Sequence, residues 1–497
     1  MNRNKKEMCH NMRSYLVILA LSTIATTSLP HNASRDLVGD DYHRFLMKPT
    51  STIDQLSVPI IKLSPEIKNE IQEYLNSTAD DLTLFMVYIA ADNDLRSFAI
   101  RNIKQMTRIG SNKNLIILVH LDIRLKKNKK VTRRYLVLKD RVIHLNADDE
   151  QTQRMDSGNP NTLISFCKFA IETFPAQKHA LILWDHGTGT LNPKRGRIVR
   201  AHERFTFNPK TEQYDLDRSS SYLDLIETEE GCCRGICWDD TTGHYLSSRD
   251  LDFALNKITN DFLGGKKLNI LAFDACLMSM LEVASIAKYY AKIMISSQEV
   301  ILGPGFQYTK TLAPFEHGSL THVEFAQHIV QEYGKVYNTI TSDYTLSAID
   351  LQGVEDLEKN VDEVAQLLKK CLSRQIKRSV KKAIYASRSN QLCTHFDEKS
   401  YIDLDHFYRN LLKNLNLFRL SDKRRQPQMI EELRHLLEEG REIIRTITIA
   451  NVVGKKLSNA RGLSIYFPEK SIHNSYPQVP FSQNNAWPSF LAHYHKY

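Results

Sequence analysis

Apolar and polar positions alternate along the chain with two different periods from about residue 82 onward. Continuous apolar runs, which predict buried strands, occupy residues 84–90, 115–121, 180–184 and 270–273. Apolar residues at helical spacing predict helices over residues 95–109, 161–174 and 248–258. Residues 135–138 and 142–145 predict an antiparallel pair. Strands that alternate with helices predict an α/β fold with a mostly parallel sheet and helices on both faces.

The last part of the chain, after about residue 319, is mainly helical in its pattern. Helical spacing is kept over residues 357–371 and 429–447. Short apolar segments that predict strands lie near residues 347–351, 401–404 and 463–467. The region 321–497 therefore either completes the main sheet or forms an appended α+β unit.

The first 29 residues combine a basic start with an apolar run from Tyr15 to Ala25, which is too short to span a bilayer unaided. This pattern predicts a secretory signal peptide, with an uncleaved membrane anchor as the alternative. Residues 30–81 carry little pattern apart from a helix start at Ser64-Pro65-Glu66, and predict a pro-segment or an N-terminal extension. We expect a secreted or periplasmic protein with no stable membrane association after signal removal.

Composition changes this picture little. The chain has 497 residues, of which 42% are hydrophobic and 25% charged, as in a globular protein larger than one ordinary domain. The net charge of +9 would suit an acidic partner, but the basic residues are spread along the chain without a nucleic-acid-binding motif. We therefore expect no nucleic acid partner.

Candidate chemistry lies at the ends of two predicted strands. Cys276 follows the strand at 270–273, and the helical spacing of the residues after it predicts a helix N-terminus, which favours the thiolate. His186 and Gly187 follow the strand at 180–184. Two neighbouring parallel strands would bring base and thiol to one sheet edge, where such sheets bind ligands. A structural cysteine is the alternative for Cys276 taken alone.

These two motifs, Trp184-Asp185-His186-Gly187 and Asp274-Ala275-Cys276, resemble the clostripain-like cysteine peptidases, which share their fold with caspases, gingipains, legumains and separases. Other blocks of that family are similar to residues 84–95, 235–241, 401–404 and 462–468, in the family's order. The likeness runs from about residue 82 to the C-terminus. It implies a caspase-like catalytic domain over residues 82–320.

The residues and the resemblance together give each side chain a role. We expect Cys276 to attack the scissile carbonyl as a thiolate and His186 to protonate the leaving amine. The backbone amides of Gly187 and Cys276 hold the oxyanion. No third residue is required, because Asp185 faces the opposite side of its strand from His186. Asp274 points to the side of Cys276, and the resemblance implies that it receives an Arg or Lys side chain; capping the next helix is its alternative role.

One segment departs from the family pattern. Residues 296–308 look like a block that usually ends in Pro-Gly-Asp-Gly-Trp, but Leu302 replaces the usual proline and Pro304 the usual acidic residue. That aspartate assists the basic pocket in relatives, so the choice between Arg and Lys stays open. We expect a monomeric cysteine endopeptidase acting on proteins or peptides with basic residues; a catalytically silent scaffold or binding protein of the same fold is the alternative.

Residues 190–230 break the alternating pattern and are rich in basic side chains. Asn-Pro pairs at 192–193 and 208–209 are typical of turns, and loops this long in a compact domain are usually functional or disordered. Because an enzyme that cuts after basic residues would find its own sites here, we expect self-cleavage into two associated chains. An uncut surface insertion is the alternative. The candidate cleavage positions are Lys194, Arg195, Arg197, Arg200 and Arg204.

The cysteines do not indicate a disulfide framework. Of eight cysteines, Cys9 lies in the predicted signal, so an odd number stays in the mature chain, which suits a free nucleophile. Cys232, Cys233 and Cys237 cluster, but no second ligand pair follows at zinc-finger spacing. Packing or one local disulfide is expected there instead of zinc.

Calcium is the remaining ligand to weigh. Oxygen ligands cluster at 92–94 and 239–240, and some relatives respond to calcium, but no EF-hand loop is present. Solvated turn carboxylates are the simpler interpretation. We expect no required cofactor, with calcium as an optional ligand.

Overall fold

The computed structural model describes most of the chain beyond residue 55. The described residues are 56, 58–76, 80–125, 129–191, 204–219, 221, 223, 235–372, 377–419, 424 and 426–496. The predicted signal peptide, four of the five candidate cleavage positions (194, 195, 197 and 200), Cys232 and Cys233 lie outside these residues.

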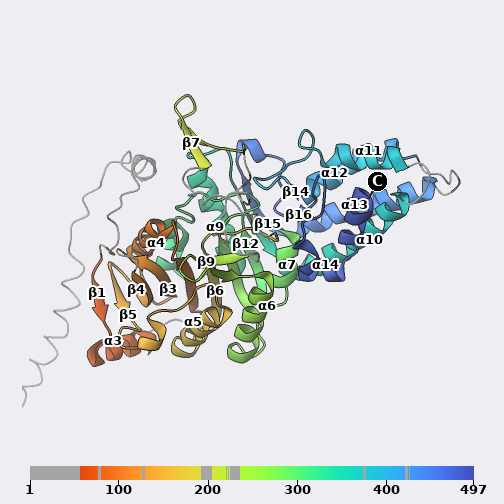
Figure 1. The fold of residues 1–497 in the computed structure, drawn as a ribbon. Helices are drawn as coiled ribbons and strands as arrows, with labels where there is room; N and C mark the ends of the chain where they lie inside the picture. Colours follow the sequence, from red (N-terminus) through yellow and green to blue (C-terminus); the bar gives the residue numbers. More distant parts are fainter. Residues whose placement is uncertain are drawn as a thin grey trace, which may run out of the picture. The chain divides into compact units, whose positions relative to one another are not determined.

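A ten-stranded sheet forms the centre of the fold (Figure 1). Its order across the sheet is β1 (Ile60–Lys62), β5 (Arg141–His144), β4 (Lys129–Leu138), β3 (Leu115–Leu125), β2 (Thr83–Ala91), β6 (Lys178–Trp184), β11 (Leu268–Asp274), β12 (Ala291–Ser296), β13 (Thr345–Asp350) and β15 (Thr448–Val453). The central strands β3, β2, β6, β11 and β12 are parallel, and antiparallel pairs flank them on both sides. The predicted α/β fold with a mostly parallel sheet is therefore confirmed, as is the antiparallel pair β4–β5.

The continuous apolar runs correspond to strands that are covered on both faces. All nine residues of β2 are buried, which explains why its sequence shows no alternation of apolar and polar positions. One group of helices contains α4 (Arg96–Ile109), α8 (Tyr308–Leu312) and α9 (His322–Tyr337), and a second contains α5 (Pro160–Thr173) and α6 (Ser248–Lys257). Figure 1 shows the two groups on opposite sides of the sheet.

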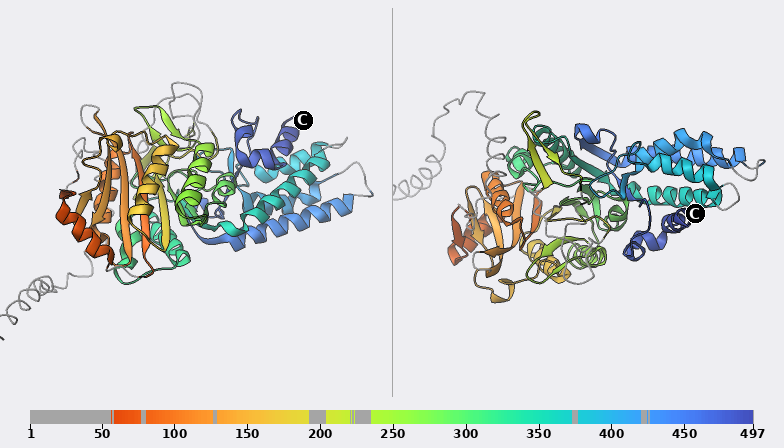
Figure 2. Two further views of the ribbon diagram at one scale, coloured as in Figure 1. Left: turned by 90° about the horizontal axis from the view of Figure 1, so that it is seen from below. Right: turned by 45° about the horizontal axis from the view of Figure 1, so that its top comes forward.

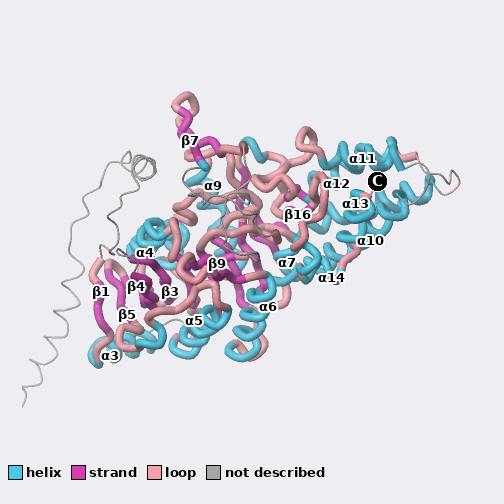
Figure 3. Tube along the Cα trace, viewed as in Figure 1, coloured by secondary structure: helices cyan, strands magenta, loops and turns pink. Residues whose placement is uncertain are grey.

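Helices dominate the chain after Val354 (Figure 3). They are α10 (Val354–Leu372), α11 (Lys377–Arg388), α12 (Leu404–Asn414), α13 (Gln426–Ile447), α14 (Pro480–Asn484) and α15 (Trp487–His495). Figure 2 shows α10 to α13 side by side, and α10 also packs on α13 and α15. The predicted strands divide between two sheets: β13 and β15 extend the main sheet, whereas β14 (Tyr401–Asp403) pairs with β16 (Ser464–Tyr466). This region therefore completes the sheet and also adds structure of its own.

Two smaller features complete the description. Ser64 begins α3 (Pro65–Asn76), where its hydroxyl accepts a hydrogen bond from the amide of Ile67, as the helix-start pattern predicts. Within the basic stretch 190–230, the sequence shows no periodic pattern, yet β7 (Phe205–Asn208) and β8 (Gln213–Leu216) form a hairpin around the predicted turn at 208–209. In the part of the chain that the structure describes, no helix is long and apolar enough to cross a bilayer.

Candidate active site

The register between β6 and β11 brings the two candidate catalytic residues together. Trp184, the last residue of β6, is paired with Asp274, the last residue of β11. His186 and Cys276 each follow two residues later, so both emerge at the same edge of the sheet. The two side chains line one cavity of about 20 Å³, together with Asp274. A volume of this size holds about one water molecule.

Cys276 does not lie at a helix N-terminus, so that prediction is wrong. The chain makes a turn over 275–279, and α7 (Leu281–Ala287) begins only at Leu281. The amides of Leu277 and Ser279 donate to the carbonyl oxygens of Glu299 and Ser297, which replaces helical hydrogen bonds. Leu277 adopts a φ of 62°, a left-handed conformation that is rare outside glycine.

The thiol of Cys276 is enclosed in this arrangement. The amide of Ile301 donates to its sulfur with an N···S distance of 3.2 Å. Burial raises the pKa of Cys276 to about 12, despite the favourable effect of the Ile301 amide. The enclosed sulfur is therefore a neutral thiol at neutral pH, and becoming a nucleophile requires a change in its surroundings.

His186 has a carboxylate partner that the sequence did not reveal. Its Nε2 lies 2.6 Å from Oδ1 of Asp94, in the turn after β2. Burial disfavours the imidazolium, but the charge of Asp94 and this hydrogen bond outweigh burial and raise the pKa of His186 to about 9. The expectation that no third residue is needed therefore misses Asp94. The only sequence signal was the acidic turn at 92–94, which we had considered for calcium.

Asp94, and not Asp185, is the hydrogen-bond partner of the His186 ring, as the alternation of side chains along a strand predicts for Asp185. The carboxylate of Asp185 accepts from the side chain of Asn93 at 2.7 Å and from the amide of Trp238. Burial raises the pKa of Asp185 to about 8. Asn93 thereby links the turn that carries Asp94 to the segment after β6 that carries His186.

Asp274 is buried at the wall of the same cavity. Its carboxylate accepts hydrogen bonds from the amide of Phe306, at 3.0 and 3.1 Å, and from the hydroxyl of Tyr308 at 2.9 Å. Burial raises the pKa of Asp274 to about 7, although both donors lower it. Because α7 begins seven residues later, Asp274 does not cap it. The carboxylate is therefore held in place by two donors beside the thiol.

Gly187 packs directly against the turn of Cys276. A Cβ atom at this position would lie 2.5 Å from the carbonyl oxygen of Cys276, far inside van der Waals contact. The residue also forms an isolated antiparallel bridge with Ile236 of β9 (Ile236–Asp239). Only glycine lets the backbone come this close to the thiol-bearing turn.

The model of the clostripain family matches residues 87–205 and 224–494, which is most of the chain. The chain belongs to the clostripain family. This membership confirms the predicted resemblance and, at the level of the family, the predicted class of cysteine peptidases.

Individual members of the clostripain family resemble the chain at low identity. Clostripain of Hathewaya histolytica is 25% identical over 291 residues, which are 54% of this chain and 49% of that protein. The chain thus spans about half the length of this curated relative. A secreted cysteine protease of the same family from Bacteroides thetaiotaomicron, solved with an irreversible peptide inhibitor, has a TM-score of 0.52 at 18% identity and covers 82% of this chain and 99% of its own.

An inactive zymogen protease of the clostripain family from Parabacteroides distasonis has a TM-score of 0.50 at 16% identity and covers 83% of this chain and 99% of its own. At such identities the likeness of the two solved structures concerns the fold, and it confirms the predicted caspase-like architecture.

The match to the clostripain family is interrupted at 206–223, where this chain has the β7–β8 hairpin. The start of the hairpin is anchored, because Arg204 is buried and forms an ion pair with Asp397. After the hairpin, Arg218 binds Glu299 at 2.7 Å and Asp343 at 3.0 Å. Of the five candidate cleavage positions only Arg204 is described. Its side chain is buried, so it cannot enter a substrate pocket and the peptide bond after it cannot be cut in this conformation.

The departure from the clostripain-family pattern at 302–304 also has a structural counterpart. The Pro304 carbonyl accepts a hydrogen bond from the side chain of Asn102 in α4 at 3.0 Å. Leu302 is buried, and it lines the cavity with Gly303 and Gly305. Asp274 is the carboxylate that β11 contributes to this cavity, and Asp185 lines the cavity as well.

Metal ligands do not converge at this site. Among the described residues no group of three or more His, Cys, Asp and Glu side chains is arranged to hold a metal ion. Cys237 is buried with a free thiol and a φ of 64°. Of the predicted cysteine cluster, Cys237 therefore has a packing role. Cys232 and Cys233 lie outside the described residues.

Proposed function

We propose that the chain is a cysteine endopeptidase that hydrolyses peptide bonds after Arg or Lys, with Cys276 as the nucleophile and His186 as the acid and base. One observation carries the proposal. The buried carboxylate of Asp274 lines the same small cavity as Cys276 and His186, where the Phe306 amide and the Tyr308 hydroxyl hold it in place. A carboxylate beside the nucleophile suits a cationic side chain at the residue before the cut.

The mechanism begins with activation of the thiol. Because His186 is already cationic below a pH of about 9, the thiol proton leaves to solvent when substrate binding relieves the enclosure that raises the pKa of Cys276, while the Ile301 amide continues to favour the thiolate. A thiolate–imidazolium pair results. The thiolate attacks the carbonyl carbon, a C–S bond forms, and the amides of Gly187 and Cys276 bind the oxyanion.

His186 then moves the two protons that complete the reaction. The C–N bond breaks as the imidazolium donates its proton to the leaving amine, which leaves a thioester and a neutral imidazole. The imidazole next takes a proton from water, and the hydroxide equivalent attacks the thioester. The acid product leaves and the thiolate returns. Asp94 stabilises the cationic form of His186 and fixes its ring by the 2.6 Å hydrogen bond. No step requires a metal or another cofactor.

Secretion and self-cleavage belong to the same proposal. The pattern of residues 1–29 supports export, and the structural relative from Bacteroides thetaiotaomicron is a secreted protease. The basic residues between Leu191 and Arg204 supply cleavage sites of the proposed specificity. The relative from Parabacteroides distasonis is an inactive zymogen, which supports a resting precursor. Mass spectrometry of the active enzyme is expected to find two chains; an intact, fully active chain would refute self-cleavage.

A matched pair of variants tests the role of Asp274. Glu282 is also buried and accepts from one backbone amide, that of Tyr466, and one tyrosine hydroxyl, that of Tyr476. Burial raises its pKa to about 7 as well, but it lies outside the cavity. Fluorogenic peptides with Arg, Lys, Asp or Leu before the scissile bond are the substrates.

We expect turnover of the Arg and Lys peptides alone, none by Cys276→Ala, and a large rise in KM for basic peptides in Asp274→Asn. Glu282→Gln is expected to keep the preference even where its stability falls. An Asp274→Asn enzyme that still selects basic peptides would refute the assigned role of Asp274.

A catalytically silent scaffold is the second candidate. The enclosed thiol of Cys276 and a cavity of about 20 Å³, too small for an arginine side chain, favour it. Limited proteolysis between Leu191 and Arg204 separates the two candidates. Activity that appears after this cut identifies a resting enzyme, whereas continued inactivity toward all four peptides identifies a scaffold.

A further inference from the structure

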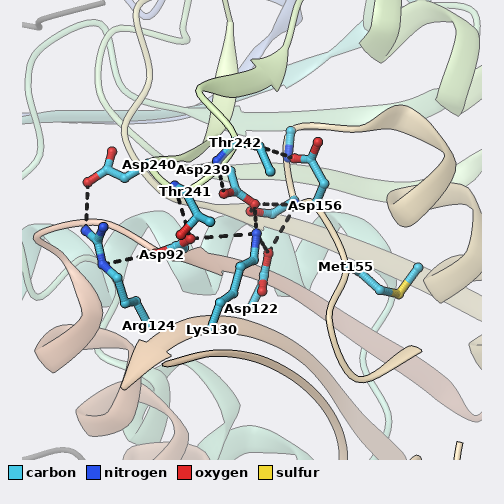
Figure 4. A network of polar contacts seen from close by, with 12 residues as sticks. Asp92, Asp122, Arg124, Lys130, Met155, Asp156, Asp239, Asp240, Thr241 and Thr242 are labelled. Carbon is cyan, nitrogen blue, oxygen red and sulfur yellow. Dashed lines mark hydrogen bonds and ion pairs between the residues drawn. The ribbon is translucent and has the colours of Figure 1, made fainter. Parts of the chain in front are cut away.

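A lysine ammonium sits among three buried carboxylates (Figure 4). Lys130 of β4 forms an ion pair with Asp239 at the end of β9, and its Nζ lies 3.1 Å from Asp122 of β3 and 3.7 Å from Asp92. The three carboxylates have no solvent exposure, and the lysine side chain is 11% exposed. We call these four residues the Lys130 cluster.

Backbone amides and hydroxyls hold the carboxylates in place. The amide of Ser157 donates to both Asp122 and Asp239 at 3.1 Å, and the hydroxyl of Thr132 donates to Asp122 at 3.1 Å. The amide of Thr242 donates to Asp239 at 3.1 Å. Separate strands and turns therefore aim their oxygen atoms at one point, and the Lys130 ammonium occupies that point.

The Lys130 cluster is joined to the proposed catalytic residues through one turn. Asp92, Asn93 and Asp94 are consecutive: the first binds Lys130, the second binds Asp185, and the third binds His186. Whatever fixes Asp92 therefore also fixes the backbone that presents Asp94 to His186.

A second link runs through an arginine. Arg124 binds Asp92 at 3.2 Å and Asp240 at 3.1 Å, and Asp240 follows Asp239 directly in the chain. Figure 4 shows Arg124 and Lys130 on two sides of Asp92. The charge of Asp240 also favours the cationic form of His186.

The charges in the cluster explain why a cation is needed at this point. Three buried carboxylates close together repel one another, and burying a carboxylate without a cation is costly. Burial raises the pKa of Asp122 to about 7, and the ammonium of Lys130 counteracts that rise. The ligands are all oxygen atoms, which is the set that hard divalent cations such as calcium prefer.

Calcium does not fit the cluster as it stands. The ammonium of Lys130 forms an ion pair with Asp239 and lies where a divalent cation would have to bind, and two cations cannot share one point. The acidic residues at 92 and 239, which we considered for calcium from the sequence, are thus already neutralised from within the chain.

We propose that the Lys130 ammonium is a built-in substitute for a divalent cation, and that it positions Asp94 against His186 without any metal. This inference rests on the proposed function only for its effect on catalysis. Lys130 is a positioning residue, because it acts through Asp92 and Asp94 and touches no reacting atom. With Lys130 among them, the three carboxylates are not a metal site, as is true of every group of such side chains in the described residues. Without the lysine side chain, we expect them to bind calcium.

The binding test uses protein with Cys276→Ala, so that it does not depend on activity. Calcium chloride is titrated by calorimetry into this protein and into its Lys130→Ala and Lys130→Met forms. Lys288→Ala is the matched control, because Lys288 is 9% exposed and is also ion-paired with a carboxylate, that of Glu358. We expect the two Lys130 variants to bind calcium at least about tenfold more tightly than the parent and to gain melting temperature with calcium.

Lys288→Ala is expected to lose stability with no calcium response. Parent protein that binds calcium as tightly as Lys130→Ala would overturn the proposal. So would Lys130 variants that neither bind calcium nor fold in its presence, because the three carboxylates would then not form a cation site.

The catalytic test uses the active enzyme with an Arg peptide. Loss of an outer positioning group commonly costs about 10–100-fold in activity, and we expect this loss in kcat, with KM little changed, in Lys130→Ala. Calcium chloride should restore most of it, and should leave Lys288→Ala unchanged. If every form is inactive, the proposed peptidase function fails while the calorimetry still decides the role of Lys130. Lys130→Ala with unaltered kcat would overturn the positioning role.

Discussion

The ion pair between Asp94 and His186 offers the sharpest test of the site. Asp94→Asn keeps the shape of the side chain and removes its charge. The two atoms that define the pair, Oδ1 of Asp94 and Nε2 of His186, are 2.6 Å apart, and both side chains are largely buried. The substitution therefore changes electrostatics with little change in packing.

The size of the effect follows from the pKa of His186. Burial alone would place it below the ordinary value of 6.5, but Asp94 raises it to about 9. At 1.36 kcal/mol per pKa unit, this rise corresponds to about 3 kcal/mol of preference for the imidazolium. Without Asp94 burial dominates, and we expect the pKa of His186 in Asp94→Asn to fall to 6.5 or lower.

Two measurements report this change. In Cys276→Ala protein, an NMR titration of the histidine Cε1 protons, with the His186 signal assigned from its loss in His186→Gln, gives the pKa directly. In the active enzyme, kcat at pH 7.5 should fall about tenfold or more in Asp94→Asn, because an imidazole with a pKa of 6.5 or lower is mostly neutral at this pH and no longer supplies the leaving amine with a proton. Asp156→Asn is the control, since Asp156 pairs with a different histidine, His244, at 2.5 Å.

Stability should show the same linkage. A group whose pKa is raised on folding stabilises the native state fully below its unfolded pKa, and this contribution disappears as the pH rises through the folded value. For His186 the loss runs from pH 6.5 to about 9 and amounts to about 3 kcal/mol at most. The free energy of unfolding in urea, compared between Cys276→Ala and its Asp94→Asn double variant, should therefore differ more at pH 6 than at pH 10.

The His186 signal of Asp94→Asn could titrate at the same pH as the parent signal, or Asp156→Asn could move that signal as much as Asp94→Asn does. Either result would mean that Asp94 does not set the charge of His186.

Three further predictions concern the surroundings of the site. Gly187→Ala should cost about 1–3 kcal/mol in the urea-unfolding free energy and most of the activity, because its Cβ would lie 2.5 Å from the Cys276 carbonyl oxygen; Gly318→Ala, with open space around it, should cost far less, and equal losses would contradict the clash. For an Arg peptide, kcat/KM should rise as the pH passes about 7, where Asp274 ionises. Tyr308→Phe should move that midpoint upward, because the tyrosine hydroxyl lowers the pKa of Asp274; an unmoved pH profile would show that Asp274 is not the group being titrated. Arg218→Ala should destabilise the protein by about 2 kcal/mol in thermal or urea unfolding, because Glu299 and Asp343 are buried and lose a shared cation; a neutral effect would mean that the β7–β8 hairpin contributes nothing through this pair.

The strands and most helices were predictable because their residues are buried on both faces or along one stripe. The strands ending at Trp184 and Asp274 are examples, and the position of the catalytic pair followed from the ends of these strands. The helix predicted directly after Cys276 is absent because the amides of Leu277 and Ser279 donate to carbonyl oxygens at 297–299 and not to carbonyl oxygens of a preceding helical turn. Buried turn residues are as apolar as helix residues, so the sequence pattern could not separate the two.

The partner of His186 could not be predicted for a different reason. Asp94 and His186 follow different strands, and their contact depends on the register between β2 and β6, which pairs Ile89 with Trp184. The acidic turn at 92–94 showed that carboxylates were present, but the sequence cannot show which of them faces the imidazole. The same limit applies to Lys130. In the sequence it is one of two adjacent lysines, Lys129 and Lys130, and nothing there indicates that its ammonium meets three carboxylates.

The pairing of β6 with β11 also has a consequence for a chain cut between Leu191 and Arg204. The strands β1 to β6 form one uninterrupted half of the sheet, and β11, β12, β13 and β15 form the other, so within the sheet a single parallel pair joins the two halves. His186 belongs to one fragment and Cys276 to the other. Such a product would be a natural split enzyme, in which neither fragment can react alone and in which dissociation and inactivation are one event.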